Sequence, residues 1–230
     1  INNEDELRNF FATKEPWVEY IMEEFIDGEL FSFDGVCDAF SNVSYPVFHH
    51  YPTPIMDIVN DRKDCIYYTS PFIPTDLYEA GCRVVKAFGA KSRFFHLEFF
   101  RLKSDKPGLG VAGDIIGLEV NMRVPGGYTP DLVNFAYSVD IYQIWADVIT
   151  FNENRQYLGN PRGYCCYVGR RDNVWYKHSY EDICYAYQNE LKWVNRMPDA
   201  LSGAMGNYFF MARFTDYDKM WEYINYCLEY

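Results

Sequence analysis

The chain has 230 residues, of which 49% are hydrophobic and 19% aromatic, so it can bury a substantial core in one or two domains. Its net charge of −12 argues against nucleic acid or an anionic membrane surface as the main partner. No apolar run approaches the roughly 20 residues that span a bilayer, and we expect a soluble, cytoplasmic protein.

The seven cysteines form an odd set without a Cys-x-x-Cys pair, and most lie inside apolar segments. This pattern is typical of reduced core cysteines and argues against zinc ligands and disulfides. The adjacent Cys165 and Cys166 leave redox chemistry open as an alternative, but core packing explains them more simply. The set consists of Cys37, Cys65, Cys82, Cys165, Cys166, Cys184 and Cys227.

The N-terminal half predicts a short capped helix over 3–14, antiparallel strands over 32–51, a loop at 51–54 and a helix over 74–89. No signal peptide precedes the first helix. Between the first helix and the strands, Asp27-Gly28 could form a hairpin turn. On the second helix the residues expected to share the buried face are Leu77, Ala80, Val84 and Phe88.

Two further strands are predicted over 93–100 and 118–123, with the glycine-rich segment 103–110 as their hairpin connection. Side chains alternate between the two faces of a strand. Glu119, Asn121 and Arg123 therefore share one face of the second strand, while its other face, which we expect to be packed, carries Leu118, Val120 and Met122.

Antiparallel pairing of these two strands would bring Glu98 beside Glu119 and Asn121. Two carboxylates and an amide oxygen suit a hard cation such as Mg²⁺, which usually arrives with a phosphate. The alternative is an edge strand whose polar groups simply face water. His96 shares the face of Glu98, where a structural histidine is the simpler interpretation, and the pair His49-His50 lies near a loop.

After these strands, Thr129-Pro130-Asp131 predicts the start of a helix that runs to about Ile149. Just before it, Gly126 and Gly127 could let backbone N–H groups approach a substrate carboxylate or phosphate, or could form a tight turn. From about Phe151 the sequence predicts a small βαβα unit, with strands over 164–169 and 207–214 and helices over 179–194 and 216–228.

The segment Glu119-Val-Asn-Met-Arg123, preceded by Glu98 on the neighbouring strand, resembles the metal motif of the ATP-grasp superfamily. That motif is an acidic residue on one strand followed by Glu-x-Asn-x-Arg on the next. The resemblance implies that Glu98, Glu119 and Asn121 bind Mg²⁺, or Mn²⁺ in its place. It implies that Arg123 holds the transferring phosphoryl group or the acyl phosphate.

Upstream, the segment 20–34 resembles the ATP-grasp hinge and the strand that follows it. The resemblance implies that backbone groups of Glu24 and Ile26, with Glu23 alongside, bind the adenine edge of ATP, and that Glu29 contacts the ribose. Apolar neighbours such as Met22 and Phe25 would sandwich the adenine ring.

An α+β fold follows from the resemblance, with an ATP-grasp nucleotide- and Mg-binding lobe over 1–150 and a small α/β C-terminal subdomain over 151–230. Residues 1–22 would be the tail of the first lobe and the hinge. The segments that precede the hinge in ATP-grasp enzymes are not present in this sequence. We therefore expect the C-terminal portion of a longer enzyme, inactive on its own, for which a homodimer is one allowed state.

The activity implied is that of an ATP-dependent ligase. A small-molecule carboxylate would be activated as an acyl phosphate, and an amine or other nucleophile would displace the phosphate. The stretch Arg123–Gly127 looks closer to carboxylate–amine and amino-acid ligases than to biotin carboxylases, while the wider resemblance includes carbamoyl-phosphate synthase-like and biotin carboxylase-like members. The alternative is a non-catalytic module that senses nucleotide or supports assembly.

Overall fold

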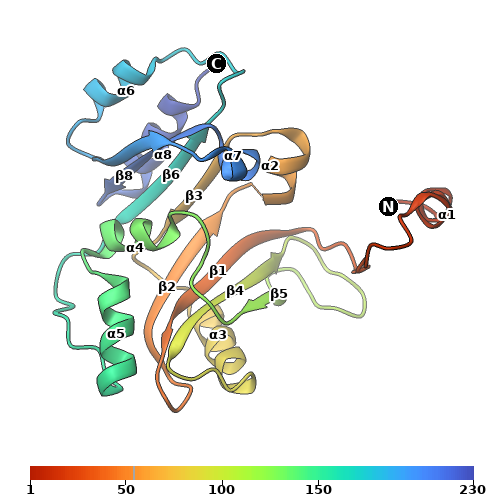
Figure 1. Cartoon of the computed structure of the whole chain (residues 1–230), viewed down its shortest axis with the longest axis horizontal. Helices are drawn as coiled ribbons and strands as arrows, with labels where there is room; N and C mark the ends of the chain where they lie inside the picture. Colours follow the sequence, from red (N-terminus) through yellow and green to blue (C-terminus); the bar gives the residue numbers. More distant parts are fainter. Residues whose placement is uncertain (54) are drawn as a thin grey trace.

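The computed structural model describes residues 1–53 and 55–230. Its strands form one antiparallel sheet in the order β5-β4-β1-β2-β3-β6-β8-β7, with helices on both faces (Figure 1). The strands are β1 Gly28–Cys37, β2 Val43–Tyr51, β3 Cys65–Thr69, β4 Arg93–Leu102, β5 Ile115–Asn121, β6 Tyr164–Arg170, β7 Leu191–Arg196 and β8 Tyr208–Phe214. The helices are α1 Glu4–Thr13, α2 Ile55–Asp61, α3 Thr75–Ala87, α4 Thr129–Tyr137, α5 Ile141–Phe151, α6 Tyr180–Ala186, α7 Asp199–Met205 and α8 Tyr217–Cys227. The predicted α+β class is confirmed.

One face of the β1–β4 region packs against α3. Aromatic residues alternate with polar ones along β1, so that Phe31 and Phe33 point to the helix side, together with Leu97 of β4. The helix approaches closely at Gly81, where an added Cβ would lie 2.0 Å from the Phe33 ring. That approach determines which helix residues are buried.

The buried row of α3 differs from the one predicted. Leu77 and Ala80 are buried, but Phe88 is 64% exposed and Val84 is only half-buried. Val85 is buried in their place, one helical turn after Gly81. The contact at Gly81 thus turns the helix so that the row 77–81–85 faces the sheet.

The opposite face of the same strands packs against α4 and α5. The single helix predicted over 129–149 is wrong, because it breaks between these two elements. Ser138 ends α4 in the left-handed region with φ 54°, and the Asp140 side chain then accepts hydrogen bonds from the backbone N–H groups of Tyr142 and Gln143. The two helices contact different strands: α4 lies against β3, β6 and β8, and α5 lies against β1 and β4.

The C-terminal part extends the same sheet, because β6 pairs with β3 across residues 65–69. A helix was predicted over 179–194, but α6 ends at Ala186 and residues 191–196 form β7. These residues pair with β8, so tertiary pairing outweighs their local helical pattern. The division of the chain at residue 150 remains a prediction.

The predicted N-terminal helix forms, and the Asn3 side chain caps it by accepting from the Glu6 N–H. None of its residues is buried, and Figure 1 shows it apart from the sheet. All seven cysteines are free thiols. Among the described residues, no helix has the length and apolarity needed to cross a membrane.

Candidate functional site

A row of polar side chains crosses four strands on the face of the sheet opposite α3. In the register, Ser32 lies opposite Glu98 and Asp34 opposite His96. On the other side of β4, Glu98 lies opposite Glu119, and His96 opposite Asn121. Directly opposed residues in an antiparallel pair share a face. We call this set, with His49 of β2, the polar face: Ser32, Asp34, His49, His96, Glu98, Glu119 and Asn121.

The Asp34 carboxylate accepts hydrogen bonds from three other residues of the polar face, and its side chain is 2% exposed. One carboxylate oxygen accepts from the Ser32 hydroxyl and from Nδ1 of His49 at 2.7 Å. The other oxygen accepts from Nδ1 of His96. A buried carboxylate is stable only when it is paired and hydrogen-bonded in this way.

His96 connects this buried carboxylate to Glu98, since its Nε2 lies 3.1 Å from Oε1 of Glu98. Both ring nitrogens therefore donate to carboxylates, which requires the imidazolium form. Burial alone would lower the pKa of His96, but the neighbouring charges of Asp34 and Glu98 and their hydrogen bonds raise it to about 10. Burial likewise opposes ionisation of Asp34, and His96 and His49 outweigh it and hold the pKa of Asp34 well below its usual range.

The three predicted metal ligands lie on adjacent strands of this face. Glu98 and Glu119 are direct cross-strand neighbours, and the register shifts next to them because Leu118 of β5 is an extra residue without a partner in β4. The Asn121 amide nitrogen is buried and has no hydrogen-bond partner among the described residues. Across those residues, no three His, Cys, Asp or Glu side chains are placed to hold a metal by themselves.

That donor set nevertheless fits Mg²⁺, which typically uses one or two carboxylates together with waters and phosphate oxygens. Because His96 binds one oxygen of Glu98, the carboxylate is oriented while its second oxygen is left for another partner. The assignment of Glu98, Glu119 and Asn121 as ligands remains a prediction.

Two expectations about the metal strand need correction. Leu118 and Val120 were expected on a packed face, but they are 40% and 36% exposed because β5 is an edge strand with one neighbour only. The strand also ends at Asn121, so Arg123 follows it in a bend. Arg123 is exposed, and its Nη1 donates to the Val124 carbonyl at 2.9 Å.

Residues 14–27, which include the first part of the segment 20–34 predicted as hinge and strand, join α1 to β1 without helix or strand, and the alternative of a hairpin turn at Asp27-Gly28 is not formed. Met22 and Phe25 are 72% and 83% exposed. Lys106, from the β4–β5 loop, donates to the Phe25 carbonyl at 2.5 Å and pairs with Glu24 at 3.1 Å. Glu23 and Glu29 are exposed. Among the described residues, the backbone groups of Glu24 and Ile26 make no hydrogen bond, which leaves them open to a ligand.

A cavity of about 210 Å³ opens beside the polar face. His96 and Glu98 line one end, and Gly126 and Gly127 line its rim. The remaining wall is mainly apolar and includes residues from α2 and α7, which lie side by side in Figure 1. The β5–α4 loop thus leads from the predicted metal strand directly to this cavity.

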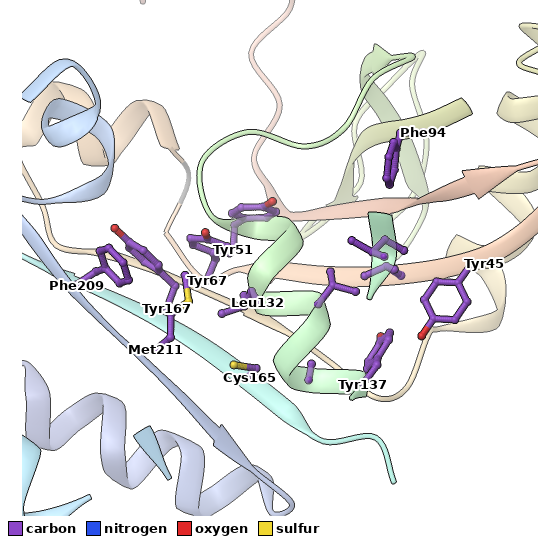
Figure 2. Close-up of a cluster of buried hydrophobic side chains, with 14 of the residues drawn as sticks. Tyr45, Tyr51, Tyr67, Phe94, Leu132, Tyr137, Cys165, Tyr167, Phe209 and Met211 are labelled. Carbon is purple, nitrogen blue, oxygen red and sulfur yellow. The ribbon is translucent and has the colours of Figure 1, made fainter. Parts of the chain in front are cut away.

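The tyrosine side of the cavity is a rigid aromatic stack. Tyr51 and Tyr67 stack at 5.5 Å between ring centroids, and Tyr67 stacks on Tyr167 at 5.0 Å. Phe209 continues the row at 5.1 Å from Tyr167, and Figure 2 shows these four rings together, with Leu132 of α4 beside them. Such a wall is preorganised for a ligand.

Solved structures share the fold of this chain. Phosphoribosylglycinamide synthetase from Anaerococcus prevotii matches with a TM-score of 0.56 at 13% identity, over 97% of this chain and 58% of that one. N5-carboxyaminoimidazole ribonucleotide synthetase from Thermotoga maritima matches with a TM-score of 0.57 at 14% identity, over 96% of this chain and 55% of that one. The chain has an ATP-grasp fold.

Another structure with this fold is the ATPase subunit of phosphoribosylaminoimidazole carboxylase from Aquifex aeolicus, with a TM-score of 0.57 at 16% identity, over 89% of this chain and 59% of that one. The chain thus spans less than two thirds of the length of these ATP-grasp structures. No protein-family model matches the sequence, and no curated protein matches it either.

The sequence analysis did not predict that Ser32 and Asp34 of β1 lie opposite Glu98 and His96 of β4. The signal was present, because Ser32 and Asp34 interrupt an aromatic strand with the same spacing as His96 and Glu98. It also missed the cavity wall from α7, which no local pattern connects to residues about 100 positions earlier.

Proposed function

We propose that the protein containing this chain is an ATP-dependent ligase. It activates a carboxylate as an acyl phosphate, which an amine or another nucleophile then attacks. The observation that carries the proposal is the register that puts Glu98 opposite Glu119 and His96 opposite Asn121, beside a cavity, within an ATP-grasp fold. The solved structures with this fold include two named synthetases, which supports a ligase.

The nucleotide site is proposed at the hinge. Backbone groups of Glu24 and Ile26 offer a donor and an acceptor to the adenine edge, with Glu23 alongside, and exposed Met22 and Phe25 provide apolar contacts for the ring. The exposed Glu29, on the first strand after the hinge, is the ribose contact. The bond from Lys106 to the Phe25 carbonyl holds the hinge against the β4–β5 loop.

Mg²⁺, or Mn²⁺, would be held by Glu98, Glu119 and Asn121. When bound, the ion neutralises charge on the phosphate oxygens of ATP. The contribution of the chain itself is orientation: Asp34 holds His96, and His96 holds Glu98 by one carboxylate oxygen at 3.1 Å.

In the reaction, a carboxylate oxygen of the substrate attacks the γ-phosphorus of ATP. The bond from this phosphorus to the bridging oxygen breaks, and ADP leaves with the electron pair. The nucleophile next attacks the acyl carbon, and the carbon–oxygen bond to the phosphoryl group breaks, releasing inorganic phosphate. Arg123, exposed between the metal strand and the cavity rim, stabilises the negative charge that develops during phosphoryl transfer.

The test uses the full-length protein with ATP, MgCl₂, a panel of carboxylates and hydroxylamine, which converts acyl phosphates into coloured hydroxamates. We expect Arg123→Ala to lower turnover about 10²–10³-fold with little change in ATP affinity, because its partner is transition-state charge. Arg83→Ala on α3, an exposed arginine on the other side of the sheet, is the matched control.

The second candidate is a non-catalytic module that senses nucleotide or supports assembly. It predicts ATP binding without ADP formation for any carboxylate. Equal turnover in Arg123→Ala and Arg83→Ala would remove Arg123 from the mechanism.

A further inference from the structure

The cavity beside Glu98 differs sharply in chemistry from one end to the other. At the polar end, His96 and Glu98 are the only charged side chains among the described residues that line it. The helix side of the wall carries Ile58 of α2 together with Leu201, Ala204 and Met205 of α7. The other uncharged lining residues are Tyr51, Cys65, Tyr67, Pro125, Gly126, Gly127 and Thr129. A ligand that fills this space therefore presents a polar group to the sheet and an apolar group to the helices.

We propose that the cavity receives the side chain of the carboxylate substrate, and that this substrate is a monocarboxylic acid with an uncharged phenyl or branched alkyl side chain. The inference rests on the proposed ligase function, because that function places the reacting carboxylate near Glu98 and the Gly126-Gly127 rim.

The size of the cavity supports this class. Its volume is about 210 Å³, and an apolar protein cavity of about 150 Å³ is large enough to take up benzene. A phenyl or branched butyl group therefore fits, whereas a methyl group would leave most of the space empty. Tyr51 and Tyr67 line the cavity and offer aromatic contacts to a phenyl group.

The charge of the wall excludes the main alternatives. A second carboxylate or an ammonium group on the substrate would lie against Leu201, Ala204 and Met205, and none of these described side chains offers it a counter-charge or a hydrogen bond. Leu201 is 42% exposed, so an ion there keeps part of its hydration, and we expect a loss of about 10-fold in kcat/KM relative to an apolar group. Selectivity against charged side chains therefore comes from α7, a helix that belongs to the C-terminal part of the chain.

The packing of the rim shows how closely α7 approaches. Gly127 has φ +60°, and an added Cβ would lie 2.8 Å from the end of the Met205 side chain. The cavity is thus bounded on this side by a direct contact between the β5–α4 loop and α7. A change of side-chain volume on α7 therefore alters the space available to a ligand.

The first experiment measures hydroxamate formation by the full-length protein with ATP, MgCl₂ and hydroxylamine. Hydroxylamine nitrogen attacks the acyl carbon, phosphate leaves, and the nitrogen loses a proton to the buffer. We expect 3-phenylpropionate and 4-methylpentanoate to give kcat/KM about 10-fold above succinate and 5-aminopentanoate. Equal or better activity with either charged acid would overturn the substrate class.

The second experiment tests whether side chains of α7 cause the substrate selectivity. Ala204→Phe fills the cavity, and we expect kcat/KM for 3-phenylpropionate to fall about 100-fold. Ala200→Phe, the same change at an exposed position one turn earlier on α7, is the control and should leave it unchanged. Leu201→Ala removes side-chain volume from the wall. It should therefore raise kcat/KM for the longer 4-phenylbutanoate relative to kcat/KM for 3-phenylpropionate. Equal effects of Ala204→Phe and Ala200→Phe would overturn the assignment of the cavity.

A binding measurement separates this inference from the proposed function. If no acid yields a hydroxamate, the ligase reaction is refuted. Calorimetric titration of 3-phenylpropionate into the same protein then shows whether the cavity binds an apolar acid. Saturable binding that is lost in Ala204→Phe and kept in Ala200→Phe would support the cavity as the site for an apolar acid. No binding to the unmodified protein would overturn it.

Discussion

Replacing Asp34 by Asn should destabilise the protein strongly, because it removes the carboxylate that neutralises a buried imidazolium. The Asp34 side chain is 2% exposed, and it binds both His49 and His96. The amide keeps nearly the same shape but carries no charge. The substitution therefore isolates electrostatics from packing.

The magnitude follows from the pKa of His96, which the folded structure raises from 6.5 to about 10. At ~1.36 kcal/mol per pKa unit, this rise corresponds to about 5 kcal/mol shared between Asp34 and Glu98. Removing one partner of a buried ion pair costs about 3–5 kcal/mol in unfolding free energy. For a domain of this size, the melting temperature should fall by about 6–20 °C.

The effect should depend on pH with a defined sign. Because the folded state raises the pKa of His96 from 6.5 to about 10, its contribution is complete below pH 6.5 and is lost as the pH rises toward 10. Asp34 has the opposite sign, since its pKa is lowered, and its contribution is lost in acid. The difference in unfolding free energy between the unmodified protein and Asp34→Asn should therefore shrink by about 2–3 kcal/mol between pH 6 and pH 9.

Urea denaturation of both proteins at pH 6 and pH 9 measures these quantities. Glu79→Gln, which removes one exposed carboxylate from α3, is the matched control and should change the unfolding free energy by less than about 0.5 kcal/mol. A loss in Asp34→Asn that is no larger than in the control, or that is the same at both pH values, would refute the buried charge network.

Three further substitutions test the fold and the proposed site. Gly81→Ala should lower the unfolding free energy in urea denaturation by about 1–3 kcal/mol, because its Cβ would lie 2.0 Å from the buried Phe33 ring. Alanine favours helices, so a more stable variant would contradict the close approach of α3 to the sheet. Gly127→Ala should cost about 1–2 kcal/mol in the same assay, since φ is +60°, and an unchanged midpoint would show that this backbone angle is not retained. Glu119→Gln in the full-length enzyme should raise the MgCl₂ concentration needed for half-maximal ADP formation, and an identical Mg²⁺ dependence would exclude Glu119 as a ligand.

The sequence predicted the parts of the site that lie within one hairpin. The spacing of Glu98, Glu119 and Asn121, together with the glycine-rich connection, indicated two antiparallel strands, and the structure contains them as β4 and β5. Local patterns suffice here because alternation along a strand and a short loop constrain the register. The same holds for α1, whose cap is formed by a residue three positions away.

Features that depend on distant contacts were beyond local patterns. The strand β7 follows from pairing with β8, and the buried row of α3 follows from its close approach to the sheet at Gly81. The exposure of Leu118 and Val120 follows from the edge position of β5, which the sequence of that strand does not reveal. The cavity joins Glu98 to Ala204, so its wall is visible only once the whole chain has folded.

The central claim, transfer of a phosphoryl group to a carboxylate, can be tested directly with an oxygen label. The full-length protein is incubated with ATP, MgCl₂, hydroxylamine and whichever acid gives the most hydroxamate, labelled with ¹⁸O in its carboxylate. An acyl phosphate carries one carboxylate oxygen into the phosphate when the acyl carbon is attacked. The account predicts one ¹⁸O atom in each inorganic phosphate released, as measured by mass spectrometry. Unlabelled phosphate, or none at all, would contradict it.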